Sequence, residues 1–469
     1  MLARTLLAFA LAVSLLAACG GAVAQPQTVS PPVTLVPSEA TAPPTLAAAE
    51  PTSAPATAAP EPTPVPSEPP TAPPSPTVAP ATPAAAPGDE LLFLRGGALI
   101  AHDLGSGAER QLAEQVLDFA PAPDGRSVAL IRNLGKGADA SGIDLWLVGR
   151  DGGGLRQLTR DGFGLIEATP AWSPDSAALA YAASASSDPY ARTWQEWAAW
   201  CDASSVHVLD IASGADQGFG EGCDPAISPD GKRIAFATAP TVRLENPSFF
   251  NAANAIRLIN RLGQNGWKFA EAAGAPGTAG AKQGLLVYAP AWSPDSAQIV
   301  YQRFLGYQAL VDINLSEIGG SLEGKGKLLA DGAGWMLPAR FAPGGGAVAL
   351  VENNYSDARG FGGYDNWSVE VLTLAGTHEI ALPEGTLSAV GQRIGQLARA
   401  QAAAWSPDGA ALAVLLPPGW NPNLPSDEPV GGEDQPGEIW RWRPGSPPER
   451  QLAANVDPAS PVFWLAAAQ

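Results

Sequence analysis

Only three histidines occur among 469 residues, so side chains suited to acid–base chemistry near neutral pH are scarce. His207 lies in a strand-like run, His102 lies beside one, and His378 follows Gly376 and Thr377 in a predicted turn. We interpret His102 and His207 as packed or rim residues, not as bases or ligands. The sequence has no nucleophile-elbow, phosphate-loop, zinc-binding or dinucleotide-binding motif. It therefore predicts a protein that is not an enzyme and that needs no cofactor and no metal.

An aspartate recurs in the phrase Ala-Trp-Ser-Pro-Asp, which occupies residues 171–175, 291–295 and 404–408. Weaker copies occur at residues 122–125, 227–231 and 341–345. One carboxylate per copy could suggest a set of metal ligands. The aspartates are explained instead by a tight turn, in which Pro presets its own φ and the following Asp or Gly tolerates the backbone conformation that the turn requires. Short apolar runs follow every copy, so the pattern predicts strand, turn and strand, several times over.

The strands around each turn are followed by a third strand, such as 143–148 or 439–442, and by a fourth, such as 156–159. Four short strands per unit are typical of a propeller blade. Six units are complete, and two fragments remain: 91–112 lacks an innermost strand, and 459–465 resembles a spare one. One blade built from both chain ends would close the ring and remove two open sheet edges.

We therefore predict an all-β fold: a β-propeller, with seven four-stranded blades, closed by the N- and C-terminal strands in one blade. Eight blades would require a further repeat inside one of the two longest intervals.

The Ala-Trp-Ser-Pro-Asp phrases, the strand Arg233-Ile-Ala-Phe236 and the closing Arg156-Gln-Leu-Thr159 resemble the TolB-type, WD40-like propeller repeat. The resemblance covers residues 89–469 and implies the fold, whereas propellers of this kind host binding, scaffolding and catalysis alike. Two features depart from the relatives. The α/β domain that precedes the propeller of TolB is replaced by a Pro-rich segment, and the hydrolase domain of prolyl-oligopeptidase relatives is missing.

The first residues predict export. Arg4 and the apolar run 6–16 are typical of a signal peptide, here residues 1–18, and the run is too short for a stable membrane span. The sequence Leu16-Ala-Ala-Cys19 resembles the bacterial lipobox, in which the cysteine is acylated, so we expect lipidation at Cys19. The alternative is an ordinary secretory signal with a coincidental cysteine. Gly20 leaves the choice of membrane open.

Residues 19–88 are predicted to be a disordered linker, because residues 25–88 are rich in Pro, Thr, Ala and Ser and contain no Lys or Arg. The net charge of −19 argues against nucleic acid as a partner. We expect a monomer in the cell envelope or at the cell surface, attached to a bacterial membrane only through its lipid anchor.

Four connections between second and third strands are long: residues 184–205, 239–254, 352–368 and 417–438. In a propeller they lie on the face opposite the Ser-Pro-Asp turns, and we call this side the loop face. Their aromatic residues are typical of recognition surfaces, although long loops also pack such residues into small cores. The binding candidates are Trp194, Trp197, Trp200, Tyr355, Tyr364, Trp367 and Trp420.

Cys201 lies in the first long connection, and Cys223 lies just before the next innermost strand, so both fall on the loop face between adjacent blades. An even pair in an exported protein predicts a disulfide.

The preferred hypothesis is a binding or interaction module for an envelope protein, a peptide or a glycan. The alternative is an enzyme of the glycoside hydrolase or lyase type, acting on envelope or extracellular polysaccharide. A third reading is a scaffold or signalling accessory without a small ligand.

Overall fold

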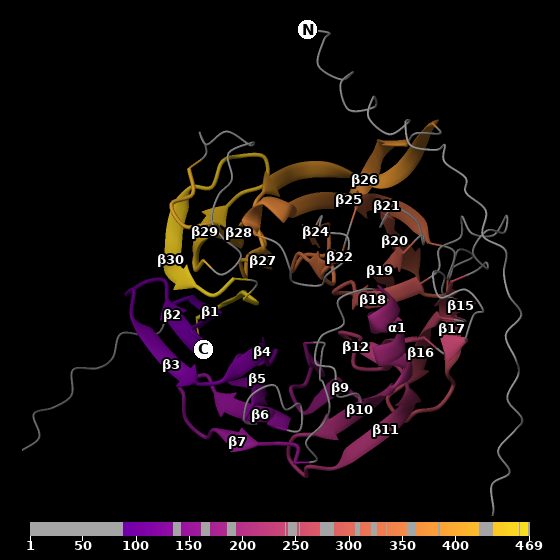
Figure 1. The fold of residues 1–469 in the computed structure, drawn as a ribbon, viewed down its shortest axis with the longest axis horizontal. Helices are drawn as coiled ribbons and strands as arrows, with labels where there is room; N and C mark the ends of the chain where they lie inside the picture. The colour runs from indigo at the N-terminus through magenta and orange to yellow at the C-terminus, as the bar shows by residue number, and fades with distance from the viewer. Residues whose placement is uncertain are drawn as a thin grey trace, which may run out of the picture. The chain divides into compact units, whose positions relative to one another are not determined.

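The computed structural model describes residues 88–134, 142–160, 169–184, 194–239, 241–242, 251–252, 254–272, 286–304, 310–319, 326–333, 335–353, 363–382, 385–421, 435–458 and 460–467. Of two units, Met1–Thr77 and Val78–Gln469, only the second contains described residues. Cys19, the signal peptide and nearly all of the linker thus lie outside them. In the second unit, seven antiparallel blades form a ring, which confirms the predicted propeller and its blade number (Figure 1).

The first four blades follow one another in chain order. Blade 1 contains β4 (Val116–Pro121), β5 (Ser127–Asn133), β6 (Ile143–Gly149) and β7 (Arg156–Gln157). Blade 2 contains β8 (Ala171–Trp172), β9 (Ala178–Ser184), β10 (Ser204–Asp210) and β11 (Asp216–Glu221). Blade 3 contains β12 (Cys223–Ile227), β13 (Arg233–Thr238), β16 (Ala255–Asn260) and β17 (Trp267–Glu271). Blade 4 contains β18 (Leu286–Trp292), β19 (Gln298–Phe304), β20 (Leu310–Glu317) and β21 (Lys327–Ala333).

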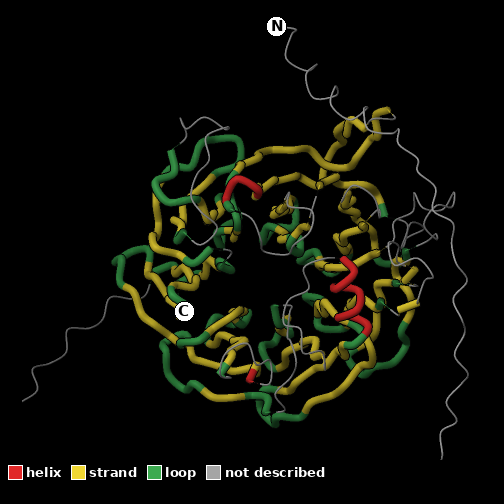
Figure 2. The backbone as a smooth tube through the Cα atoms, viewed as in Figure 1, coloured by secondary structure: helices red, strands yellow, loops and turns green. Residues whose placement is uncertain are grey.

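The remaining blades complete the ring. Blade 5 contains β22 (Trp335–Met336), β23 (Arg340–Phe341), β24 (Ala347–Asn353), β25 (Trp367–Leu382) and β26 (Gly385–Ala398). Blade 6 contains β27 (Ala402–Trp405), β28 (Leu412–Leu416), β29 (Gly437–Trp442) and β30 (Arg450–Val456). Blade 7 contains β31 (Phe463–Leu465), β1 (Glu90–Arg95), β2 (Ala98–Asp103) and β3 (Glu109–Ala113). Additional elements are the ribbon β14 (Thr241–Val242) with β15 (Asn251–Ala252), the helix α1 (Trp194–Asp202) and the 3-10 helix η3 (Tyr364–Asn366) (Figure 2).

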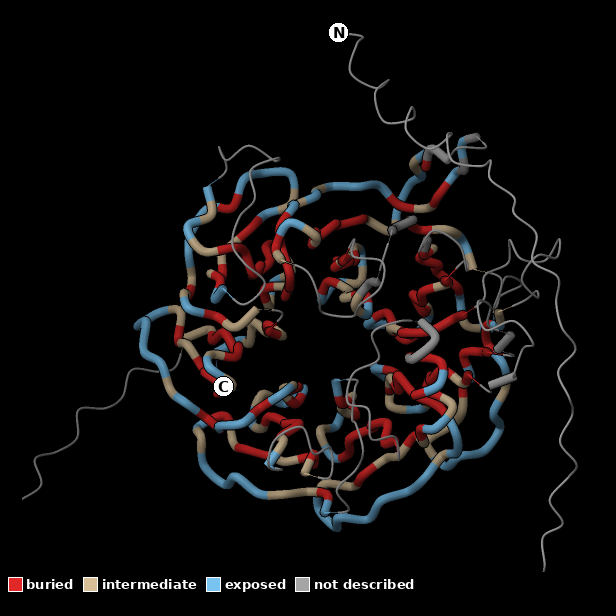
Figure 3. The backbone as a smooth tube through the Cα atoms, viewed as in Figure 1, coloured by how far each residue is buried: buried red, intermediate tan, exposed pale blue. Residues whose placement is uncertain are grey.

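The core lies between blades, at their inner strands. Every residue of β9 is buried, whereas the outermost strand of the same blade, β11, is almost entirely exposed (Figure 3). An inner strand is covered on both faces by neighbouring blades, which explains why its sequence is a continuous apolar run without alternation. The outer rim faces water and tolerates Asp, Gln, Gly and Glu.

The repeated phrase forms a tight turn that also joins adjacent blades. In blade 2 the Ser176 amide donates to the Ser173 carbonyl at 2.9 Å, and the Ala178 amide donates to Ser173 Oγ at 2.9 Å. The tryptophan makes a contact between blades, because Trp172 Nε1 donates to the carbonyl of Ala120 in blade 1 at 2.9 Å. The equivalent indoles of blades 4 and 6 donate to blades 3 and 5. The aspartates accept hydrogen bonds within these turns, as turn chemistry requires.

The last strand of the chain closes the ring, as predicted. β31 pairs with β1 in antiparallel register, with Phe463 opposite Leu92 and Leu465 opposite Glu90. On the loop face, the Gly96 and Gly97 amides donate to the two carboxylate oxygens of Asp457 at 2.7 and 2.8 Å. The two chain ends are therefore held together by side chains as well as by strand pairing.

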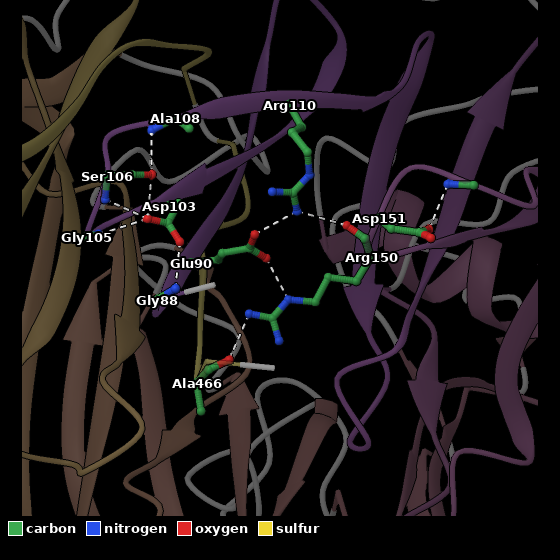
Figure 4. A network of polar contacts seen from close by, with 11 residues as sticks. Gly88, Glu90, Asp103, Gly105, Ser106, Ala108, Arg110, Arg150, Asp151 and Ala466 are labelled. Carbon is green, nitrogen blue, oxygen red and sulfur yellow. Dashed lines mark hydrogen bonds and ion pairs between the residues drawn. The ribbon is translucent and has the colours of Figure 1, made fainter. Parts of the chain in front are cut away.

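A buried carboxylate anchors the other end of this closure (Figure 4). Glu90 is fully buried and forms ion pairs with Arg110 and Arg150, each at 2.6 Å. Arg150 also donates to the carbonyl of Ala466 at 2.7 Å, so one guanidinium connects blade 1 to both chain ends. A buried charge is tolerated only when it is paired and hydrogen-bonded, and these partners satisfy that requirement.

Asp103, at the end of β2, should make the propeller sensitive to strong acid. The amide of Ser106 and the hydroxyl of Ser106 each donate to Asp103 Oδ1 at 2.7 Å, and these bonds lower the pKa of Asp103 to about 2. An aspartate in the unfolded chain has a pKa near 3.9. The stabilisation is thus complete above about pH 4 and is lost as the pH falls toward 2.

The substitution Asp103→Asn tests this, because it keeps an acceptor but removes the charge. We expect it to lower the free energy of unfolding at pH 7 by on the order of 1 kcal/mol. Urea unfolding at pH 7 and at pH 2 measures the difference in the free energy of unfolding between the wild type and Asp103→Asn. This difference should be smaller at pH 2. A difference that is the same at both pH values would contradict the assignment.

Candidate functional site

The loop face receives the connections between the second and third strands of the blades. Their described parts are α1 in blade 2, the ribbon β14–β15 in blade 3, η3 in blade 5 and the residues around Trp420 in blade 6. These elements decide which of the predicted aromatic residues can meet a partner.

α1 turns Trp197 and Trp200 into the core. Trp197 is fully buried with its ring centroid 5.2 Å from that of Tyr288 in blade 4, and Trp200 is 4% exposed. Both belong to one apolar cluster that also contains Ala237 of blade 3. The insertion of blade 2 therefore covers the next two blades, and these two indoles stabilise the loop face without being presented to a partner.

The predicted disulfide is present between Cys201 of α1 and Cys223 of β12, and both cysteines are fully buried. It ties the insertion of blade 2 to the innermost strand of blade 3. The cysteines are 22 residues apart, and closing a loop of that length stabilises a fold by about 3 kcal/mol in the chain-entropy model.

Replacing both cysteines by alanine should therefore lower the free energy of unfolding by about 3 kcal/mol. Urea unfolding of the oxidised protein, the reduced protein and the Cys201→Ala/Cys223→Ala variant measures this loss. Reduction that leaves the unfolding midpoint unchanged would show that the bond does not constrain the unfolded chain.

The insertion of blade 5 packs on blade 6 in the same manner. Tyr364 is fully buried, and its hydroxyl donates to the carbonyl of Gln435 at 3.2 Å. Burial raises the pKa of Tyr364. Trp367 is 3% exposed and packs with Leu416 and Trp442 of blade 6. Tyr364 and Trp367 are thus packing residues of the junction between blades 5 and 6.

Trp420 has a different environment, because it is half-buried on the surface of blade 6. Its ring lies against that of Trp440, which is also half-buried, with 5.5 Å between the centroids and 59° between the planes. The Glu438 carboxylate lies beside this pair and accepts from Trp440 Nε1 at 3.0 Å and from the Gly419 amide at 3.1 Å. We call Trp420, Trp440 and Glu438 the blade 6 site.

Blade 1 has a tryptophan at the position equivalent to that of Trp440, but a side chain of the protein covers its ring. Trp146 stands opposite Leu130 on the second strand of its blade, as Trp440 stands opposite Val414 in blade 6. The Arg132 guanidinium lies 4.5 Å above the Trp146 ring, and its Nε donates to the Glu114 carbonyl at 2.8 Å. The protein covers the indole of blade 1 with its own cation, whereas a second indole lies beside that of blade 6.

In the structure the predicted binding residues differ in their exposure to solvent. Trp197, Trp200, Tyr364 and Trp367 are buried, because the long connections pack onto the next blade, and Trp420 is half-exposed. The side chain of Trp194 and all of Tyr355 lie outside the described residues. Trp440 and Glu438 were not among the sequence candidates, because their strand reads as ordinary alternation in Ile439-Trp-Arg-Trp442.

The histidines are hydrogen-bonded within sheets. His207 lies in β10, as its strand pattern indicated, whereas His102, which was predicted to lie beside a strand, lies within β2. His378 was predicted in a turn but lies in β25, where its Nδ1 is 2.9 Å from the Gly391 carbonyl oxygen. Gly376 and Thr377 lie at an irregularity of the β25–β26 pairing, so a turn-like sequence is found here inside a long hairpin.

No group of three or more His, Cys, Asp or Glu side chains among the described residues is arranged to hold a metal ion. Within the same part of the chain, no helix is long and apolar enough to cross a membrane.

The comparisons with known proteins give a likeness of fold. No family model matches the chain, and no curated protein matches it. Among solved structures, TolB from Acinetobacter baumannii is 14% identical, with 80% of this chain and 81% of that chain covered and a TM-score of 0.41. A putative TolB from Agrobacterium tumefaciens is 18% identical, with coverages of 52% and 77% and a TM-score of 0.35. Oligogalacturonate lyase from Vibrio parahaemolyticus is 12% identical, with coverages of 68% and 80% and a TM-score of 0.45.

The sheet topology described above makes the chain a seven-bladed β-propeller. It is similar in fold to TolB proteins, as its repeated phrases indicated, and also to propellers that are enzymes. The expectation that the chain is not an enzyme stays a prediction.

Proposed function

We propose that this protein is an extracytoplasmic binding module, held at a bacterial membrane through lipidated Cys19, which engages an envelope protein, peptide or glycan through its loop face. The observation that supports binding is the blade 6 site, where two indoles and a carboxylate lie together and remain partly open to solvent. Large aromatic residues dominate the energetics of recognition surfaces, and tryptophan is enriched among their anchors.

The chemistry of the blade 6 site suits a ligand that combines an apolar face with hydroxyl or amide donors. The tilted rings of Trp420 and Trp440 offer an apolar platform. Glu438 keeps a fixed position because Trp440 Nε1 and the Gly419 amide hold its two oxygens, and an ionised carboxylate can only accept hydrogen bonds. A sugar ring or a peptide segment carries both kinds of group.

A pull-down from envelope extract with the full-length protein identifies the partner, and titration then tests the site. Trp420→Ala should weaken binding by more than about 1 kcal/mol, the level that separates an anchor from a bystander. The matched control is Trp146→Ala, which removes an indole at the same place in blade 1, where Arg132 covers the ring. Thermal melts of both variants separate lost binding from lost stability.

Unchanged affinity in Trp420→Ala, together with a loss on altering Asp175 or Asp295 at the opposite turns, would move the site to the other face and overturn the proposal.

The proposed anchor rests on the apolar run that ends in Leu-Ala-Ala-Cys19, and the proposed linker on residues 19–88. Membrane fractionation of the wild type and of Cys19→Ser tests the anchor. We expect the wild type in the membrane fraction and the variant in the soluble fraction. A wild-type protein that is released freely would contradict it.

A further inference from the structure

Three side chains in the outer half of blade 2 form a hydrogen-bonded series that the binding function does not use. Ser205 Oγ lies 2.7 Å from His207 Nε2, and His207 Nδ1 lies 3.0 Å from Asp216 Oδ2. Ser205 and His207 are two residues apart on β10, so they share one face of the strand, and β11 supplies Asp216. A hydroxyl, an imidazole and a carboxylate in this order have the geometry of a nucleophile, a general base and the group that orients the base.

The hydrogen-bond partners determine where the protons lie. An ionised Asp216 can only accept, so His207 Nδ1 carries a proton and donates it to Oδ2. His207 Nε2 in a neutral imidazole is then an acceptor, and the Ser205 hydroxyl donates to it. This is the tautomer in which histidine can remove a proton from serine.

A tyrosine supports this arrangement from the neighbouring strand. The Tyr181 hydroxyl of β9 donates to the same Asp216 oxygen at 2.9 Å. The rings of Tyr181 and His207 are stacked with 5.2 Å between the centroids and 25° between the planes. Because Tyr181 is fully buried, it holds both the carboxylate and the imidazole in place.

Small molecules can reach the series. The side chains of His207 and Asp216 are 21% and 32% exposed, and Ser205 is half-buried. The residue paired with His207 on β11 is Gly218, which has no side chain to cover the imidazole. β10 follows α1 directly, so Ser205 lies near the loop face, close to the disulfide-bonded helix.

Blade 7 contains a histidine–carboxylate pair that provides a comparison inside the same chain. His102 Nδ1 lies 3.1 Å from Glu109 Oε1, again between a third and a fourth strand. The residue two positions before His102 is Ile100, so that pair has no serine at the position that Ser205 occupies relative to His207. The hydroxyl and the supporting tyrosine therefore distinguish blade 2 from a pair that only joins two strands.

We propose that Ser205 is a nucleophile that accepts an acyl group from a carboxylic ester, with His207 as its base and Asp216 as the group that orients the base. Ser205 Oγ forms a bond to the ester carbonyl carbon, and the hydroxyl proton moves to His207 Nε2. The leaving alkoxide takes that proton and departs as an alcohol. Water then attacks the acyl-serine and passes a proton to Nε2, and Ser205 recovers it as the carboxylic acid leaves.

The surroundings of Ser205 restrict the charge of the ester. Glu221 stands directly across from Ser205 on β11, and the chain carries a net charge of −19. An anionic substrate would be repelled, so the expected substrates are neutral or cationic esters.

The test uses the full-length protein in a detergent without ester bonds, a fluorophosphonate probe and p-nitrophenyl acetate. Mass spectrometry of the labelled wild type should place the phosphonyl group on Ser205. Ser205→Ala should reduce both labelling and ester hydrolysis at least about 100-fold. Asp216→Asn should reduce them by a comparable factor, because an amide at this position favours the wrong imidazole tautomer.

Two controls accompany these variants. Ser213→Ala removes an exposed serine of the turn after β10, and His102→Gln removes the histidine of the blade 7 pair, and both should react like the wild type. Thermal melts confirm that each variant is folded. Label on a residue other than Ser205, or equal rates in the wild type and Ser205→Ala, would overturn the proposal. The inference does not depend on binding at the blade 6 site.

Discussion

Deletion of residues 457–469 should destabilise the whole propeller, with a loss of roughly 5 kcal/mol or more in the free energy of unfolding. The deletion removes β31 and uncovers Leu91, Leu92 and Phe93 of β1, all of which are fully buried. Each such side chain contributes about 1.5–3 kcal/mol when it is buried. Since typical domains are stable by only about 5–15 kcal/mol, the truncated chain is expected to be marginal or unfolded.

A shorter deletion separates the two parts of the closure. Removing residues 466–469 keeps β31 but takes away the Ala466 carbonyl to which Arg150 donates. This variant should lose stability by far less than the longer deletion, because the strand pairing and the Glu90 ion pairs remain. Urea unfolding and light scattering of both variants measure the difference, since an open β1 edge also favours aggregation. A longer deletion that is as stable as the parent would contradict closure by β31.

Trp197→Ala should have the second largest effect, a loss of about 3–5 kcal/mol in the free energy of unfolding. The side chain is fully buried, contacts the Tyr288 ring and belongs to the cluster that joins α1 to blades 3 and 4. Replacing it by alanine leaves a cavity under the helix. The buried Trp197 Nε1 has no hydrogen-bond partner among the described residues, so Trp197→Phe should lose much less by keeping an aromatic ring without that N–H group.

The matched variant for comparison is Trp420→Ala, which changes a half-buried indole on blade 6. We expect its melting temperature to fall less than that of Trp197→Ala, while its binding falls more. Thermal melts and titrations of both variants give the two readouts. A Trp197→Ala protein that keeps its stability but loses its partner would show that α1 faces the ligand, contrary to the packing described above.

Short-range sequence signals predicted the architecture because each blade is made from local pairings. Pro, Asp and Gly at the turns, with an apolar run after each, indicate two strands without any knowledge of the rest of the chain. The spare strand near residue 463 and the missing innermost strand before residue 90 predicted the seventh blade, because open sheet edges are unfavourable. The Cys201–Cys223 pair was predicted in the same way, since the strand order alone places both cysteines on one face.

The direction of side chains on the loop face was decided only by tertiary structure. Trp194, Trp197 and Trp200 recur at helical spacing, which predicts a stripe but does not say whether it faces the core or a partner. The structure buries Trp197 and Trp200 against the next blades, because α1 lies over them. Trp440 and Glu438 can be recognised as part of a candidate site only from the tertiary structure, in which Trp420 and Gly419 of the preceding connection lie beside them.

The proposed catalytic residues also show which features the sequence determined and which required the tertiary structure. The sequence by itself determined a propeller, its closure and the face that carries its long connections, because these follow from strand order and turn residues. It indicated that His207 is an ordinary strand residue. The alternation Ser205-Val206-His207 places serine and histidine on one face, but the contact with Asp216 depends on the register of β10 with β11, which is irregular after Val206. Register is fixed by the packing of the whole blade between its neighbours, so only the tertiary structure could bring these three side chains together.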